Sequence, residues 1–193
     1  IEECLQILNK YSKNTTKEQN SKKENKKNKE NKENKKKKND FNFDAKSYVQ
    51  QLTNVDLTKI PGINGNIALK LISELGVNIA GSFKNSSAFS SWLGLCPGNK
   101  VSGGKILNSK TKHNPCKAAG YFRMAAYSLH NSKSALGAFL RRMKSRIGGP
   151  KAITATAHKL AKIFYNIITK GEEYVEIGQE YYNTQYKNRV LKN

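Results

Sequence analysis

The sequence predicts a mostly α-helical fold: a helix-hairpin-helix element, then a compact helical bundle with a Gly/Lys-rich loop, all preceded by a disordered Lys/Asn linker. Three observations lead to this fold class. After position 44, apolar residues recur at helical intervals through most of the chain. No stretch shows the alternation of apolar and polar residues that a half-buried strand would have. From Lys17 to Asn39 only Lys, Asn, Glu, Gln and Ser occur, a composition that cannot bury apolar surface.

These patterns divide the chain into segments. Ile1, Leu5 and Leu8 fall at helical spacing, which predicts the remnant of an amphipathic helix. We expect four segments in order: the helix remnant at 1–14, the disordered Lys/Asn-rich linker at 15–43, a helical domain at 44–186 and a tail at 187–193. Because the chain begins with Ile rather than Met, we expect it to be a piece of something longer.

The charge balance indicates the class of partner. The chain carries 35 Lys and Arg against 14 Asp and Glu, a net charge of +21. Such an excess points first to nucleic acid and second to an anionic membrane surface. No apolar run is long enough to span a bilayer. Three scattered cysteines suit a reducing compartment. We therefore expect a cytoplasmic protein without a membrane partner.

The spacing of Ala45, Tyr48, Val49 and Leu52 predicts a short helix after Asp44 at the start of the helical domain. A hairpin pattern follows at 57–76, LTKIPGINGNIALKLISELG, which resembles a helix-hairpin-helix element. Pro61–Gly62 makes the turn, and backbone N–H groups at the start of the second helix would face a phosphate. Asn64 stands where such hairpins have a second glycine, and Asn tolerates the left-handed conformation. Packing or protein contact remains an alternative use of this hairpin.

Five further helices are expected. Ser86 would cap a short helix with Phe89, Trp92 and Leu93 on its buried side. Asn114 would cap, and Pro115 would begin, a helix running to about Asn131.

The remaining three expected helices cover the end of the chain. A helix from Ser134 would point Leu136, Phe139, Leu140, Met143 and Ile147 inward and Arg141, Arg142, Lys144 and Arg146 outward, until Gly148–Gly149–Pro150 stops it. Further helices would cover Lys151 to Lys170 and Glu172 to about Tyr186.

The stretch Gly98–Asn114, GNKVSGGKILNSKTKHN, lies between two helical patterns. Ser102 stands directly before Gly103–Gly104 and Lys105, so its hydroxyl sits on a backbone free to approach a ligand. Nearby lysines, including Lys100, favour a phosphate. A reactive serine and a flexible basic loop are both compatible with this pattern.

Metal chemistry has little support in the sequence. From Ala45 to Gly171 there are 19 Lys and Arg but only two acids, Asp56 and Glu74. Two carboxylates cannot build the site of a two-metal nuclease. The three histidines show no metal-ligand spacing, so we predict no metal site in this chain. Glu172, Glu173, Glu176 and Glu180 are expected on a solvated helix face.

Ordered blocks from about Leu57 to Tyr174 carry a family resemblance. They are IPGINGNIALKLISELG, FKNSSAFSSWLGLCPGN, SGGK, the helix with Phe122-Arg123-Met124-Ala125-Ala126, FLRRMKSRIGGPKA and AHKLAKIFYNIITKGEEY. Together they resemble the C-terminal domain of the insertion-sequence "one-ten" family of transposases, recombinases that combine four acids with a serine.

The resemblance implies DNA transposition. In this family an N-terminal acidic domain holds divalent metal, expected to be magnesium, and the C-terminal domain supplies a serine that attacks a DNA phosphodiester. Ser102 matches that serine, so it is the predicted catalytic residue. The predicted nucleic-acid contacts are Gly62, Asn64, Gly65, Lys100, Gly103, Gly104, Lys105, Arg141, Arg142 and Arg146.

The same resemblance implies partners: DNA at element ends and target, a guide-type noncoding RNA, and other copies of the full-length protein in a homo-oligomer. The acidic domain is missing from this chain, which contains no cofactor site of its own, so we expect it to be inactive alone. A catalytically inert nucleic-acid-binding remnant is the main alternative. A basic ribosome- or RNA-associated protein is a weaker one, suggested by charge alone.

Overall fold

A computed structural model describes residues 41, 43–112 and 114–191 of the chain. All elements below belong to the unit from Phe43 to Asn193. The predicted helix remnant at 1–14, and the predicted linker at 15–43 apart from Phe41 and Phe43, lie outside the described residues.

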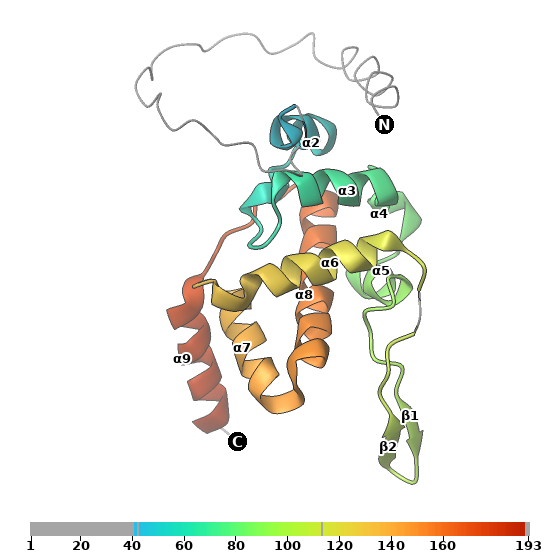
Figure 1. Ribbon diagram of the computed structural model, residues 1–193, viewed down its shortest axis with the longest axis vertical. Coiled ribbons are helices and arrows are strands. Elements are labelled where there is room, and N and C mark those ends of the chain that lie inside the picture. Colours follow the sequence, from blue (N-terminus) through green and yellow to red (C-terminus); the bar gives the residue numbers. More distant parts are fainter. Residues whose placement is uncertain (1–40, 42, 113, 192–193) are drawn as a thin grey trace. The chain divides into compact units, whose positions relative to one another are not determined.

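The described chain is mostly helical, as predicted (Figure 1). Its elements in order are α2 Ala45–Thr53, the 3-10 helix η1 Leu57–Lys59, α3 Gly65–Leu75, α4 Ile79–Ser82, α5 Ser86–Trp92, β1 Lys100–Ser102, β2 Lys105–Asn108, α6 Lys117–Ser128, η2 Leu129–Asn131, α7 Ala135–Ile147, α8 Gly149–Lys170 and α9 Gly178–Leu191.

Helix α8 is the centre of the packing. Helices α4, α5, α6 and α7 all pack against it. A chain of aromatic rings links three of these helices: Phe122 of α6 meets Phe164 of α8 at a centroid distance of 5.3 Å and Phe89 of α5 at 6.4 Å, edge to face. All three rings are fully buried. These contacts form a core of the size that the apolar spacing predicts.

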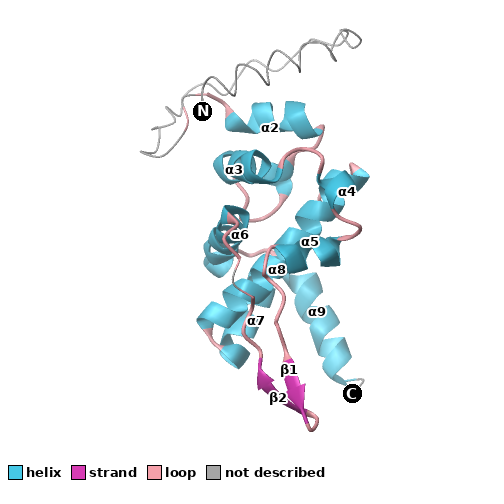
Figure 2. Ribbon diagram, turned by 90° about the vertical axis from the view of Figure 1, so that its right-hand side faces the viewer, coloured by secondary structure: helices cyan, strands magenta, loops and turns pink. Residues whose placement is uncertain are grey.

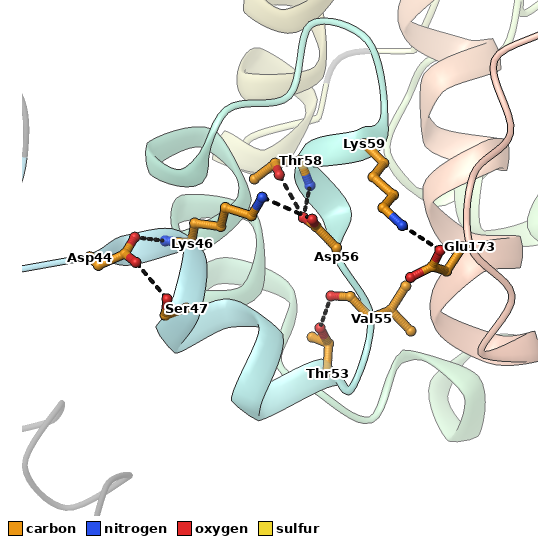
Figure 3. Close-up of polar contacts among 9 residues, drawn as sticks. All are labelled: Asp44, Lys46, Ser47, Thr53, Val55, Asp56, Thr58, Lys59 and Glu173. Carbon is orange, nitrogen blue, oxygen red and sulfur yellow. Dashed lines mark hydrogen bonds and ion pairs between the residues drawn. The ribbon is translucent and has the colours of Figure 1, made fainter. Parts of the chain in front are cut away.

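The predicted hairpin region packs as a small layer beside this core. Helix α2 packs on α3, and α3 packs on α6. Polar side chains hold its turns (Figure 3). Asp44 caps α2 by accepting the N–H of Lys46, and Asp56 caps η1 by accepting the N–H of Thr58. Asp56 also pairs with Lys46 at 3.0 Å, so one carboxylate joins α2 to η1.

Two expectations about α5 are wrong. Its N-cap is Asn85 rather than Ser86, because the Asn85 side-chain oxygen accepts the N–H of Ala88 at 2.8 Å. Trp92 is 48% exposed rather than buried, and its ring lies 5.2 Å from that of Phe83 at the surface. Of the three residues predicted to be buried, Phe89 and Leu93 lie in the core, and Trp92, the last residue of the helix, does not.

Helix α6 begins later than expected. Asn114 does not cap it: its side-chain oxygen accepts the N–H of Cys116 at 2.9 Å, and its amide donates to the carbonyl of Trp92. Pro115 therefore precedes the helix, which begins at Lys117. At its other end α6 stops at Ser128, and the 3-10 helix η2 continues the chain to Asn131.

The α7–α8 region is close to its prediction. Helix α7 begins close to Ser134, as expected, and Ser134 caps it by accepting the N–H of Gly137. Ile147 is 40% exposed instead of buried, because it is the last residue of α7. Gly148, with φ of +84°, ends α7 and directly precedes α8, so Pro150 lies in the first turn of the next helix.

The C-terminal helix differs most from its prediction. Gly171, with φ of +68°, caps α8, and α9 begins only at Gly178 and runs past Tyr186 to Leu191. The connecting segment is therefore not helical, and the acids in it do not form a solvated helix face. Glu173 pairs with Lys59 of η1, and Glu176 accepts the N–H of Ala135 at the start of α7. Within the described part of the chain, no helix combines the length and apolar character needed to cross a membrane.

Candidate nucleic-acid interface

The stretch predicted as a Gly/Lys-rich loop is a β-hairpin. β1 and β2 pair antiparallel, with Ser102 opposite Lys105 and Val101 opposite Ile106. Gly103 and Gly104 form the two-residue turn, and both have positive φ, +55° and +74°. This combination matches the type I′ turn that suits the twist of two paired strands. The expectation of no strand is therefore wrong, and the Gly-Gly pair was the signal for it.

The hairpin is an exposed arm. In Figures 1 and 2 its strands extend beyond α5 and α6, the helices that flank it in the sequence. Every described side chain of the two strands is exposed. Pairing is irregular between Lys100 and Val101, because Lys100 pairs with Asn108 and Leu107 is left between pairs. An exposed two-stranded ribbon of this kind has little core of its own.

Two glycines fix the base of the arm. A side chain on Gly94, where φ is +67°, would meet the carbonyl oxygen of Lys112 at 2.8 Å. A side chain on Gly98 would meet the carbonyl oxygen of Lys110 at 3.0 Å, and the Gly98 N–H donates to that same oxygen. The outgoing and returning backbones are thus in close contact where they leave the helices.

Ser102 lies at the end of this arm, immediately before the turn. Its side chain is exposed, and Lys100 and Lys105 on the same two strands are exposed as well. Gly103 and Gly104 have no atom within 4 Å of the place where a side chain would be. The tip is therefore open to a large ligand on the side of the glycines. His113 lies outside the described residues.

The hairpin before α3 places its glycines differently. A side chain on Gly62, where φ is +86°, would meet the carbonyl oxygen of Ala125 at 2.5 Å, so this glycine is needed for packing on α6. Gly65 approaches the backbone of Lys46 in the same way, at 3.1 Å. Asn64 is exposed and caps α3 by accepting the N–H of Ile67. Internal packing thus accounts for both glycines.

The three arginines of α7 do not share one environment. Arg146 is exposed, as predicted. Arg141 turns inward: it donates to the carbonyls of His130 and Ser132 and to the side chain of Gln179 in α9. Arg142 is also partly buried. The expectation that all three point outward is therefore wrong for two of them, because α9 covers that side of α7.

Aromatic side chains of α9 surround Arg142. The Arg142 guanidinium carbon lies 3.8 Å from the ring centre of Tyr186 and 4.8 Å from that of Tyr182. Lys159 of α8 lies 3.9 Å from the ring centre of Phe139, which also contacts Tyr182. Sequence inspection missed Lys159, Tyr182 and Tyr186 as functional residues. The four-residue interval between the two tyrosines is the signal that could have shown one aromatic face.

The charge of this cluster is not balanced locally. Burial, with the nearby charges of Arg142 and Arg189, lowers the pKa of Lys159 below its usual value. The Nε and Nη1 atoms of Arg142 are buried, and no described residue accepts a hydrogen bond from them. The helices α7, α8 and α9 together carry ten Lys and Arg residues and one acid, Glu180.

Acids elsewhere in the domain serve structural contacts. Asp56 pairs with Lys46, and Glu74 accepts the backbone N–H of Lys117 at 3.3 Å. Among the described residues, no three His, Cys, Asp or Glu side chains come together as a metal site would require. The described residues therefore contain no group of side chains that could hold the divalent metal implied by the resemblance.

Comparison with known proteins assigns the family. Residues 55–139 match the family model described as "Transposase IS116/IS110/IS902 family". The matched region includes η1, the hairpin with Ser102, α6 and the beginning of α7. No curated protein and no solved structure has significant similarity to the chain. The region from 55 to 139 is a transposase domain of the IS116/IS110/IS902 family, as the ordered sequence blocks predicted.

Proposed function

We propose that this chain is the serine-bearing, DNA-binding part of an insertion-sequence transposase, and that Ser102 is its nucleophile toward a DNA phosphodiester. The observation that carries the proposal is the position of Ser102 at the exposed end of the hairpin, opposite Lys105 and directly before Gly103–Gly104. This position lies within the region matched by the transposase family.

The chemistry follows from that position. The Ser102 oxygen attacks phosphorus and loses its proton, a new oxygen–phosphorus bond forms, and the bond from phosphorus to one sugar oxygen breaks. The released sugar oxygen takes up a proton. Lys100 and Lys105 sit on the same exposed strands. Their charge would hold the phosphate and favour the serine alkoxide.

DNA binding is supported by charge. Between Ala45 and Gly171, 19 Lys and Arg outnumber two acids, a net charge of +17. A surface of this kind binds a polyanion by releasing counterions, so affinity falls steeply as salt rises. We propose element ends and target DNA as the ligands. A guide-type noncoding RNA and further copies of the protein complete the proposed assembly.

The carboxylates and magnesium of such an enzyme would come from a separate acidic domain. Asp56 and Glu74 are already used in contacts within the fold, so they do not meet this need. We propose that the acidic domain binds the metal. The helical domain described above then presents Ser102 to the same phosphate. Alone, this chain should bind DNA without cutting it.

The test compares Ser102→Ala with Ser109→Ala, which changes an exposed serine of the same basic stretch. Each chain is combined with an intact acidic domain and labelled element-end DNA. Strand cleavage and a covalent protein–DNA adduct on a denaturing gel are measured, with DNA affinity by fluorescence anisotropy. Ser102→Ala should lose cleavage and adduct while binding as before, and Ser109→Ala should lose neither. Full cleavage by Ser102→Ala would refute the assignment.

A second candidate is a nucleic-acid-binding module without chemistry. The engagement of Asp56, Glu74, Glu173 and Glu176 in structural contacts favours it, because these four carboxylates are already used within the fold. In that case the chain binds nucleic acid with the same steep salt dependence, yet no adduct forms even with the acidic domain present.

A further inference from the structure

Arg142, which is partly buried against α9, and the exposed Lys159 form a cluster with the features of an anion site. Both cations lie against aromatic rings, and the Nε and Nη1 atoms of Arg142 are buried without an acceptor among the described residues. Arg189 of α9 lies near enough to Lys159 to lower its pKa. Three cations therefore share a region whose helices hold a single acid, Glu180.

A guanidinium has five donors in a planar fork that matches the oxygens of a phosphate. The faces of the Arg142 guanidinium are covered by Tyr182 and Tyr186, while two of its donor atoms are unused. Stacking on aromatic rings does not replace these hydrogen bonds, because it satisfies the charge rather than the N–H groups. A phosphate would satisfy both.

Helix α9 is attached in a way that allows it to move. None of its residues is buried. Its described contacts are with α7, mainly through the rings of Tyr182 and Tyr186 and the bond from Arg141 to Gln179 at 2.7 Å. The buried hydroxyl of Tyr182 lies close enough to the Arg142 guanidinium for this contact to counteract the rise of its pKa on burial, but the two groups do not form a hydrogen bond of good geometry. A poorly formed polar contact of this kind is weaker than a well-aligned one.

We propose that Arg142 and Lys159 form a phosphate-binding site at the edge of α9, and that the phosphodiester backbone of nucleic acid, held first by the exposed Lys159, displaces α9 to reach Arg142. The inference rests on the proposed nucleic-acid binding and adds a second contact region, separate from the arm that carries Ser102. It makes α9 a cover that competes with the ligand for the Arg142 guanidinium.

The first experiment uses the full chain with Tyr182→Ala and Tyr186→Ala combined. The matched control is Tyr181→Ala, which removes a tyrosine of α9 that is 54% exposed. Affinity for a labelled DNA duplex is measured by anisotropy over a range of salt concentrations. The double variant should bind on the order of tenfold more tightly, with a salt slope steeper by about one, from the additional phosphate contact of Arg142, because Lys159 is already exposed in the unaltered chain.

Adding Arg142→Gln to the double variant should remove about one unit of that slope. Tyr181→Ala should bind as the unaltered chain does. Unchanged or weaker binding by a folded double variant would overturn the inference.

The second experiment needs no variant. Hydrogen exchange of the unaltered chain is compared with and without duplex DNA, and with inorganic pyrophosphate in place of DNA. DNA should accelerate exchange of α9 amides while those of α8 stay protected. DNA binding with α9 exchange unchanged or slowed would overturn this inference alone. If pyrophosphate accelerates the exchange of α9 amides and DNA does not, the ligand of the site is a small phosphate compound rather than nucleic acid. Absence of any nucleic-acid binding would overturn the proposed function itself.

Discussion

The carboxylate of Glu176 accepts a hydrogen bond of 2.9 Å from the backbone N–H of Ala135, the first residue of α7. The same oxygen accepts the N–H of Gly178 at 3.0 Å, and the other accepts the hydroxyl of Tyr174 at 2.9 Å. Burial and this bond to Glu176 both raise the pKa of the Tyr174 hydroxyl. One acid thus joins the start of α7 to the segment that leads into α9.

Replacing this acid should loosen that junction. Glu176→Gln keeps an oxygen for the Ala135 N–H but removes the charge at the positive end of α7, so the free energy of unfolding should fall by about 1 kcal/mol. Urea denaturation measures the change. Glu172→Gln is the control, since Glu172 is exposed in the same segment. An equal loss in both variants would mean that general charge, rather than the α7 terminus, is responsible.

Gly62→Ala should destabilise the domain through packing as well as backbone strain. The new methyl group would meet the Ala125 carbonyl oxygen at 2.5 Å, at a φ of +86°. Strain and overpacking together should cost about 2–4 kcal/mol. Gly171→Ala isolates the strain of a positive φ, because Gly171 has φ of +68° in the left-handed region with no atom within 4 Å, and should cost about 1 kcal/mol. Equal losses in thermal or urea unfolding would contradict the packing role of Gly62.

Asp56 should give the domain a pH-dependent stability. Burial alone raises the pKa of this carboxyl, but hydrogen bonds from Thr58 and Lys46 and the charge of Lys46 outweigh it and lower the pKa below 3.8. Because the folded-state pKa is lowered, the stabilisation is complete above 3.8 and is lost as the pH falls through the folded value. Asp56→Asn should therefore cost about 1 kcal/mol at neutral pH and little in acid.

Unfolding of both chains across this pH range provides the measurement. Lys46→Met is the informative companion, since it removes the ion pair but leaves the two bonds from Thr58 in place. It should retain part of the pH dependence. A stability difference between Asp56→Asn and the unaltered chain that stays constant with pH would contradict the assignment.

The arm should unfold separately from the helices. Gly103 has φ of +55° at the turn, so Gly103→Val should disrupt the hairpin, whereas Gly103→Asn should keep it because Asn-Gly also favours a type I′ turn. Amide hydrogen exchange of β1 and β2 should distinguish the two variants. Their global unfolding should agree within about 0.5 kcal/mol, as the strands bury nothing in the core. A large global loss in Gly103→Val would show that the arm supports the fold.

Spacing and capping residues predicted the helices well where the relevant forces are local. Phe89, Phe122 and Phe164, each on the predicted apolar side of its helix, are buried in the core, and α7 begins close to Ser134 as expected. The predicted N-cap of α5 is wrong because two adjacent residues can both cap a helix. Asn85 and Ser86 can both cap, and the side-chain oxygen of Asn85 reaches the Ala88 N–H. The sequence alone does not decide such a choice.

Contacts between distant segments were beyond sequence reasoning. Whether Arg141 and Arg142 face solvent depends on α9, which begins some 36 residues later. The pairing of Glu173 with Lys59 likewise joins residues far apart in the chain. The hairpin at Ser102, in contrast, depends on adjacent residues. Gly103 and Gly104 form its turn, and a Gly-Gly pair between two short stretches with apolar residues is a turn signal in the sequence.

The two backbones of the arm are in close contact at Gly94 and Gly98, so the length of the arm beyond this point can change without altering how the helices pack. Beyond this point, side chains on each strand repeat every second residue, so two residues added to both strands would keep every face in place. Such an insertion would carry the serine about 7 Å farther outward. The reach of the arm is thus set by the length of the hairpin alone, while the helical core stays the same.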